Sequence, residues 1–240
     1  VSALEPCFQD RDNWQRLYLD MPGHGKSAGV DGLNNMDDVL ENILTFIDDI
    51  IPSQRFILAG MSAGGYLARG VVQQKRELVD GLLLFAPRIV ADDTQRILPS
   101  PVTLMENPDL LAELSPNEVE SMQGAVIQSR QVVERMRADV YPAWAMANWE
   151  LLQRLWEPEN WGLSFDVDAL PEPVPAPALI VSGRQDAVVG YQDAWPLLEN
   201  YPRGTFAVLD RAGHGLEVDQ EPLFQALVNE WLDRVEEYVE

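Results

Sequence analysis

The chain has 240 residues, of which 46% are hydrophobic; this composition supports one sizeable folded core and excludes an intrinsically disordered chain. Acidic residues number 39 against 17 basic ones, which gives a net charge of −22. Such a surface repels phosphate backbones and anionic bilayers, so we expect a small-molecule substrate as partner, with no nucleic acid and no membrane. The single cysteine, Cys7, allows no internal disulfide and fits a cytoplasmic setting.

The first elements along the chain alternate in type. A short apolar run over 16–20 predicts a strand, which stops at the turn-forming pair Pro22-Gly23. Apolar residues then recur at helical spacing from Met36 to Ile51, with Asn35 placed as an N-cap, and this pattern predicts an amphipathic helix.

Two continuous apolar runs follow, over 55–60 and 81–86, with a helical stretch over 64–76 between them. Runs of this kind are typical of strands that are buried on both faces. Strands that alternate with helices predict a parallel sheet with helices on either side.

The alternation stops between residues 91 and 170, where the sequence indicates helices only. A linker over 171–177, with proline at every second position, then forces an extended path. We therefore predict a helical cap over 91–170 inserted into a core formed by 1–90 and 171–240. Its aromatic residues either pack the cap itself or receive an apolar acyl or aromatic group; they are Trp144, Trp149, Trp156 and Trp161.

After the linker the core pattern resumes. Apolar strands are predicted over 178–182 and 205–209, with a helix near 191–200 between them. A last amphipathic helix presents one apolar face from Phe224 to Val235.

The pentapeptide from Gly60 to Gly64 has the pattern G-x-S-x-G, and Ser62 is its central serine. It follows a buried strand and opens a helix, which is the setting of a nucleophile elbow. We expect side chains at Gly60 and Gly64 to clash with neighbouring backbone in so tight a turn. The helix N-terminus favours developing negative charge, and the backbone N–H of Ala63 is the expected oxyanion donor.

A serine hydroxyl needs a base to attack a carbonyl, and the chain has two histidines, His24 and His214. Both follow predicted strands. In this kind of fold the catalytic residues run in the order serine, acid, histidine, and only His214 comes after Ser62. We therefore predict His214 as the base and give His24 at most a supporting contact.

The base needs a carboxylate that fixes its tautomer. Asp186 directly follows the strand 178–182 and so reaches the same sheet edge as His214. Asp92 and Asp93, after the strand 81–86, are the alternative. Asp210 is the last residue before a turn, and we expect it to point elsewhere.

Four segments in this order resemble the capped α/β-hydrolase superfamily; they are Leu19–Ser27, Gly60–Gly65, Gly183–Asp186 and Ala212–Gly215. The resemblance implies the α/β-hydrolase fold, a mostly parallel sheet flanked by helices with an inserted all-helical cap. It also implies a serine triad with no metal and no organic cofactor. Because Ser62 and not an aspartate holds the nucleophile position, dehalogenase and epoxide hydrolase activities are disfavoured.

The resemblance has one departure, since family members begin with more strands and carry part of the oxyanion hole in a loop after the third. Here only a short stretch precedes Ser62, and a second oxyanion donor is not identified. Either an N-terminal piece precedes this sequence or the chain is a truncated relative. We expect the first, because losing central strands would expose a buried sheet edge.

The sequence thus predicts a serine hydrolase that forms an acyl-enzyme, most simply a carboxylesterase-like enzyme acting on a small, largely apolar substrate. The same triad could serve a C–C bond hydrolase, an aminopeptidase or a thioesterase. A non-catalytic ligand-binding member of the fold is the alternative outside the enzymes.

Overall fold

A computed structural model describes residues 2–29 and 32–240 of the chain. The sheet in this part of the chain has 4 parallel strands in the order β1-β2-β3-β4. Their bounds are Phe56–Ser62 for β1, Val79–Pro87 for β2, Ala178–Gly183 for β3 and Gly204–Leu209 for β4. The predicted α/β-hydrolase fold class is confirmed, and each of these strands was predicted to within two residues.

The register of the sheet brings the strand ends together. Ser62 at the end of β1 lies opposite Pro87 at the end of β2. Gly183 at the end of β3 lies opposite Leu209 at the end of β4. Because all the strands run the same way, the loops after them meet at one edge of the sheet, where open α/β sheets place their sites.

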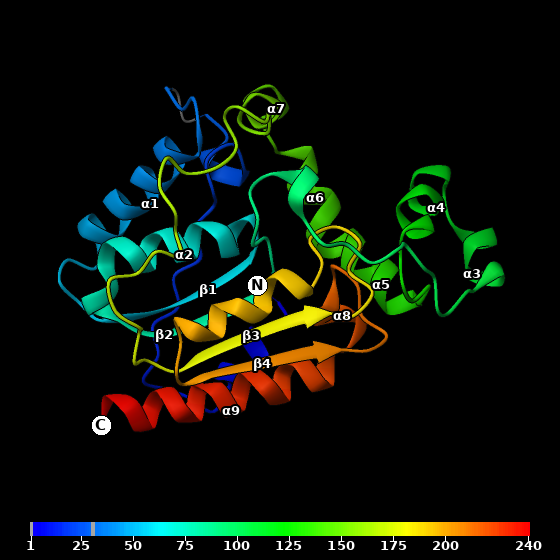
Figure 1. Cartoon of the computed structure of the whole chain (residues 1–240). Helices are drawn as coiled ribbons and strands as arrows, with labels where there is room; N and C mark the ends of the chain where they lie inside the picture. Colours follow the sequence, from blue (N-terminus) through cyan, green and yellow to red (C-terminus); the bar gives the residue numbers. More distant parts are fainter. Residues whose placement is uncertain (1, 30–31) are drawn as a thin grey trace.

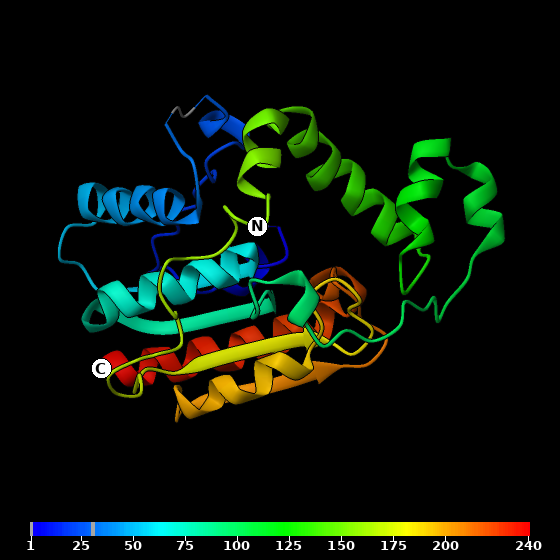
Figure 2. The same ribbon diagram turned by 45° about the horizontal axis from the view of Figure 1, so that its top comes forward.

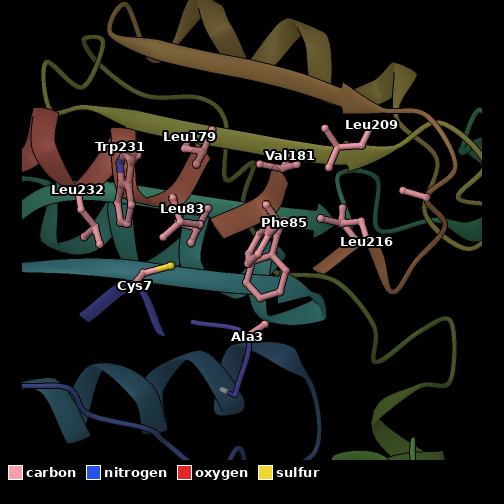
Figure 3. Close-up of a cluster of buried hydrophobic side chains, with 14 of the residues drawn as sticks. Ala3, Cys7, Leu83, Phe85, Leu179, Val181, Leu209, Leu216, Trp231 and Leu232 are labelled. Atoms are coloured by element: carbon pink, nitrogen blue, oxygen red, sulfur yellow. The ribbon is translucent and has the colours of Figure 1, made fainter. Parts of the chain in front are cut away.

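Successive residues of a strand point to opposite faces, and this alternation builds two core layers. Leu83 and Phe85 of β2 pack toward α9, the final helix (Glu221–Val239). Figure 3 shows this layer, with Trp231 and Leu232 of α9 against the sheet. Leu82 and Leu84 point the other way, toward α2 (Ala63–Lys75).

Helix α1 (Met36–Ile50) covers the outer side of α2. Asn35 caps it as predicted, because its side chain accepts a hydrogen bond of 3.0 Å from the backbone N–H of Asp38. The predicted apolar face is buried at Met36, Val39 and Leu40 and continues to Ile47. In Figure 1, α1 and α2 lie on one side of the sheet and α9 lies on the other.

The chain between β2 and β3 contains only helices as regular elements in the described residues, plus one isolated bridge between Met105 and Ile127. Figures 1 and 2 both show α3 and α4 standing away from the sheet. The helices between β2 and β3 are η4 (Asp93–Gln95), α3 (Pro108–Glu113), α4 (Pro116–Gln123), α5 (Arg130–Arg135), η5 (Met136–Val140), α6 (Tyr141–Ala145) and α7 (Trp149–Leu155). The division into core and cap at residues 91 and 170 stays a prediction.

One predicted strand is absent, and one predicted helix is a 3-10 helix. The segment 16–20 forms no strand, because it has no ladder partner in the described residues, and Leu17 and Tyr18 are exposed. The helix near 191–200 is a 3-10 helix, η6 (Gln192–Glu199), because Pro196 inside it lacks the N–H that an α-helix needs. The remaining short helices are η1 (Glu5–Phe8), η2 (Gly25–Ser27), η3 (Arg76–Leu78) and α8 (Leu216–Asp219).

β1 lies at the edge of the sheet in the described residues and is only partly buried. A cavity of about 1010 Å³ lies beside its N-terminal end and is lined by Trp14, Phe56 and Ile57, among others. This cavity is at the end of the strands opposite Ser62. None of the described helices is both long enough and apolar enough to cross a bilayer.

Candidate active site

Ser62 occupies the sharp turn between β1 and α2. Its backbone has φ 51° and ψ −120°, a conformation that residues other than glycine rarely adopt. Such strain costs on the order of 1–3 kcal/mol and is concentrated at functional sites. Ala63 is the first residue of α2, so its N–H lies at the helix end that favours negative charge.

The glycines around Ser62 differ in what they allow. A Cβ at Gly60 would come within 2.5 Å of the Gly64 carbonyl oxygen, so a side chain is excluded there as predicted. A Cβ at Gly64 would meet nothing within 4 Å, and the predicted clash at this residue was wrong. The second crowded glycine is Gly65, whose Cβ would lie 2.9 Å from the side chain of Pro87. The helix turns Gly64 outward and Gly65 toward the sheet.

His214 and Asp186 lie side by side. Nδ1 of His214 and Oδ2 of Asp186 are 3.0 Å apart. Asp186 is fully buried, and its other oxygen accepts hydrogen bonds from the backbone N–H groups of Val188 and Val189 at 2.8 and 3.0 Å. These bonds fix the carboxylate, and the carboxylate in turn orients the imidazole.

Ser62 stands on the same edge of the sheet, at the end of β1, whereas Asp186 and His214 follow β3 and β4. No hydrogen bond joins Ser62 to His214 within the described residues. The structure therefore brings the predicted acid and base together and places the predicted nucleophile on their side of the sheet without a direct bond. Hydrogen bonds between catalytic groups are often longer before substrate binds.

The alternative acids have other partners. Asp93 pairs with Arg88 and Arg96, and Asp92 accepts hydrogen bonds of 2.9 and 2.7 Å from Thr94. Asp210 accepts a hydrogen bond of 2.9 Å from Gln185. Among the described aspartates, Asp186 is thus the one bonded to His214.

His24, the second histidine, stays in its own turn. Its Nδ1 lies 3.2 Å from the carbonyl oxygen of Pro22. This contact stays within the turn that follows residue 20.

A cavity of about 950 Å³ opens at Ser62 and Ala63. Val188 and Val189, which donate to Asp186, line the same cavity. Its walls combine aromatic, aliphatic and charged side chains, among them Tyr66, Arg88, Arg96, Trp156, Trp161 and Leu163. The space next to the serine is large enough for a small organic substrate.

The family model for serine aminopeptidases, S33, matches residues 10–221, which is most of the chain. The chain belongs to the serine aminopeptidase S33 family. It is therefore a hydrolase of the α/β-hydrolase superfamily, as the resemblance predicted.

Proteins similar to this S33 hydrolase include other hydrolases and structures with the same fold. An α/β superfamily hydrolase from Oenococcus oeni PSU-1 superposes with a TM-score of 0.84 at 28% identity, over 98% of this chain and 88% of the other. The 2-hydroxy-6-oxo-6-(2'-aminophenyl)hexa-2,4-dienoic acid hydrolase of Metapseudomonas resinovorans is 24% identical over 92% of this chain and 75% of its own length. A meta-cleavage product hydrolase from Pseudomonas fluorescens IP01 shares the fold, with a TM-score of 0.66 at 20% identity over 97% of this chain and 84% of that one.

The tryptophans between β2 and β3 take two roles in this S33 hydrolase. Trp156 and Trp161 line the cavity at Ser62. Trp149 donates its indole N–H to the Trp144 carbonyl oxygen at 3.1 Å. The Trp149 ring also packs edge-on against the Trp156 ring, with centroids 6.1 Å apart, so Trp156 takes part both in packing among the tryptophans and in the cavity wall.

Sequence reasoning missed Tyr66 and Arg88 as cavity residues. Tyr66 lies one helical turn beyond Ser62 on α2, and its hydroxyl accepts a hydrogen bond of 3.0 Å from the Leu163 N–H. Arg88 comes directly after β2. Its place at the carboxyl end of a parallel strand was the available signal, because side chains there reach the site of an open α/β sheet.

Proposed function

We propose that this protein is a serine hydrolase that cleaves an ester through an acyl-enzyme, with Ser62 as nucleophile, His214 as base and Asp186 as its partner. The observation that carries the proposal is the buried Asp186 carboxylate 3.0 Å from Nδ1 of His214, on the sheet edge where β1 ends in Ser62. A fixed acid–base pair on the same sheet edge as a strained serine supports nucleophilic catalysis.

In the first half of the reaction the Ser62 oxygen attacks the carbonyl carbon of the ester. His214 accepts the hydroxyl proton on Nε2, and Asp186 stabilises the resulting imidazolium through Nδ1–H. The backbone N–H of Ala63 donates to the developing oxyanion at the start of α2. The tetrahedral intermediate collapses when His214 returns the proton to the leaving alcohol, which leaves Ser62 acylated.

In the second half water attacks the acyl carbon, and His214 again serves as base. The second tetrahedral intermediate then releases the carboxylic acid and restores the Ser62 hydroxyl. This sequence needs a hydrogen bond between Ser62 and Nε2 of His214, which we expect to form once substrate fills the cavity.

The cavity supports a small and largely apolar substrate. Trp156, Trp161 and Leu163 offer apolar surface beside Ser62, and a volume of about 950 Å³ suits a small organic molecule. We place the enzyme in the cytoplasm, because its lone Cys7 forms no disulfide within the chain.

A fluorophosphonate probe tests the nucleophile directly. We expect the wild type to be labelled and Ser62→Ala to be unlabelled, with 4-nitrophenyl ester turnover lost in parallel. Ser182→Ala is the matched control, since Ser182 is a fully buried serine on β3. Labelling that survives in Ser62→Ala would refute the assignment.

The alternatives predict other outcomes of the same experiment. A receptor that binds ligands without catalysis would give no labelling of the wild type. A C–C bond hydrolase, an aminopeptidase or a thioesterase would be labelled at Ser62 but would turn over the corresponding substrate faster than the ester.

A further inference from the structure

Arg88 is built into the neighbourhood of Ser62. It follows β2, and its backbone N–H donates a hydrogen bond of 3.0 Å to the carbonyl oxygen of Ser62. Arg69, fully buried in α2, donates to the carbonyl oxygens of Arg88 and Ile89 at 3.1 and 2.8 Å. The main chain that carries the Arg88 side chain is thereby fixed relative to the serine.

The guanidinium of Arg88 forms part of the cavity wall. Its Cζ lies 4.1 Å from the centroid of the Trp161 ring, a stacked cation–π contact. Nη2 pairs with Asp93 and with the Ala91 carbonyl oxygen, and Nε lies 3.4 Å from the Val90 carbonyl oxygen. Nη1 has no protein partner in the described part of the chain.

Two arginines, Arg88 and Arg96, lie together at this wall. Burial lowers the pKa of Arg88 to about 10 despite the attraction of Asp93, and Arg96 beside it lowers the pKa further. Asp93 pairs with both arginines, so one carboxylate is shared by two guanidinium groups.

The cavity wall also has spare hydrogen-bond donors. The buried side-chain polar atoms of its lining residues that lack a partner are Nε1 of Trp161 and Nε of Arg96, as far as the described residues go. Both atoms are donors. Unpaired donors next to two guanidinium groups match a ligand that brings hydrogen-bond acceptors and a negative charge.

We propose that Arg88 is a substrate-binding residue and that the substrate carries one carboxylate, which this guanidinium holds in the cavity beside Ser62. This inference rests on the proposed hydrolase function and specifies its substrate class. A carboxylate fits because it is planar, singly charged and able to accept hydrogen bonds from a guanidinium. The aromatic and aliphatic walls then take the rest of the molecule.

The acidic residues of the lining do not oppose this assignment. Asp37 accepts hydrogen bonds from the N–H and hydroxyl of Ser164 at 3.0 and 3.1 Å. Asp92 and Glu159 are exposed at the rim, where water screens their charge. The net charge of −22 slows the approach of anions but acts at long range, whereas Arg88 acts by contact.

The test compares charged and neutral esters of matched shape. In the first pair, mono(4-nitrophenyl) adipate carries a carboxylate on the acyl side and 4-nitrophenyl hexanoate is its neutral counterpart. In the second pair, 3-carboxyphenyl acetate carries a carboxylate on the alcohol side and phenyl acetate is its neutral counterpart. For each pair the kcat/KM of the charged ester is divided by that of the neutral one. Dividing this ratio for the wild type by the ratio for a variant cancels the intrinsic reactivity of the esters.

We expect Arg88→Met to lower the charged-to-neutral ratio about tenfold to a hundredfold for at least one pair, the effect of losing one charge-assisted hydrogen bond. Arg88→Lys keeps the charge without the planar fork and should recover part of the ratio. Arg203→Met removes an exposed arginine that lies over Tyr238 and should leave every ratio unchanged.

Equal losses for both members of each pair in Arg88→Met and Arg88→Lys would overturn the proposal, because they indicate a merely structural arginine. Fluorophosphonate labelling of the same samples separates this result from failure of the proposed function. If the wild type is not labelled, calorimetric binding of monomethyl adipate against methyl hexanoate still decides the role of Arg88. Binding of the anion that is weakened in Arg88→Met supports the proposal, and no difference refutes it.

Discussion

The Asp186 carboxylate accepts from two backbone N–H groups with one oxygen and lies 3.0 Å from the His214 ring with the other. The acid is thus held by the turn after β3 independently of the histidine. A carboxylate at this nitrogen favours the imidazole tautomer that has its proton on Nδ1 and a lone pair on Nε2.

Replacing Asp186 by asparagine should separate geometry from electrostatics. The amide introduced by Asp186→Asn would keep one acceptor for Val188 and Val189 but could not favour the productive tautomer of His214. We expect kcat for 4-nitrophenyl esters to fall by roughly 10³- to 10⁴-fold. Steady-state kinetics check this, with Asp109→Asn as the control, because Asp109 is exposed on α3 and its variant should keep wild-type turnover.

Glycine substitutions should distinguish the crowded positions of the elbow from the open one. Gly60→Ala places a methyl group 2.5 Å from a backbone oxygen, and overpacking of this kind costs about 1–3 kcal/mol. Gly64→Ala points into open space and should leave the melting temperature unchanged or raise it. Thermal unfolding of the two variants checks this order, and equal destabilisation would contradict it.

Asp219, behind the His214 loop, should make stability depend on pH. Burial raises its pKa from 3.8 to about 6, although it accepts a hydrogen bond of 2.9 Å from the Gly213 N–H. The folded state therefore favours the protonated acid, and its contribution to stability is complete below pH 3.8 and is lost as the pH rises through about 6.

Asp219→Asn should consequently match the wild type near pH 4 and be more stable by up to about 3 kcal/mol at pH 7. Urea unfolding across this range measures the difference. Asp210→Asn is the control with the opposite sign, because the Gln185 side chain lowers the pKa of Asp210 and the stabilisation appears as pH rises. A difference for Asp219→Asn that does not change with pH would contradict the assignment.

Arg69 should be among the most sensitive arginines of the chain. Its side chain is fully buried and binds Asp168 and two backbone carbonyl oxygens. Arg69→Met leaves those acceptors unpaired, and we expect a loss of about 3–5 kcal/mol in the free energy of unfolding. Arg130→Met removes an exposed pair with Glu113 and should cost no more than about 1 kcal/mol in the same urea titration.

The sequence was sufficient for features that local pattern and chain order control. Apolar runs located the strands, because a strand buried on both faces has few polar residues. The order of catalytic residues along the chain favoured His214 over His24. A place directly after the strand 178–182, at the sheet edge that His214 also reaches, favoured Asp186 over Asp92, and neither preference needed knowledge of side-chain packing.

Other features depend on partners that are distant in sequence. The run at 16–20 has the composition of a strand but lies without a ladder partner in the described residues, and periodicity cannot reveal whether a partner exists. The second crowded glycine is Gly65 and not the predicted Gly64, because the direction of each Cβ follows from how α2 meets β2. The contact of Arg88 with Trp161 joins a residue just before the helical insertion to one near the end of it.

The outer helices α3, α4 and α5 enclose a small hydrophobic cluster of their own, formed by Leu110, Met122 and Val133. This cluster shares no residue with the layers that hold the sheet. Substitutions there alter the periphery while the scaffold that carries the reacting groups keeps its packing. Evolution can therefore remodel this part of the molecule at a faster pace than the rest, and diversity among homologues should concentrate in it.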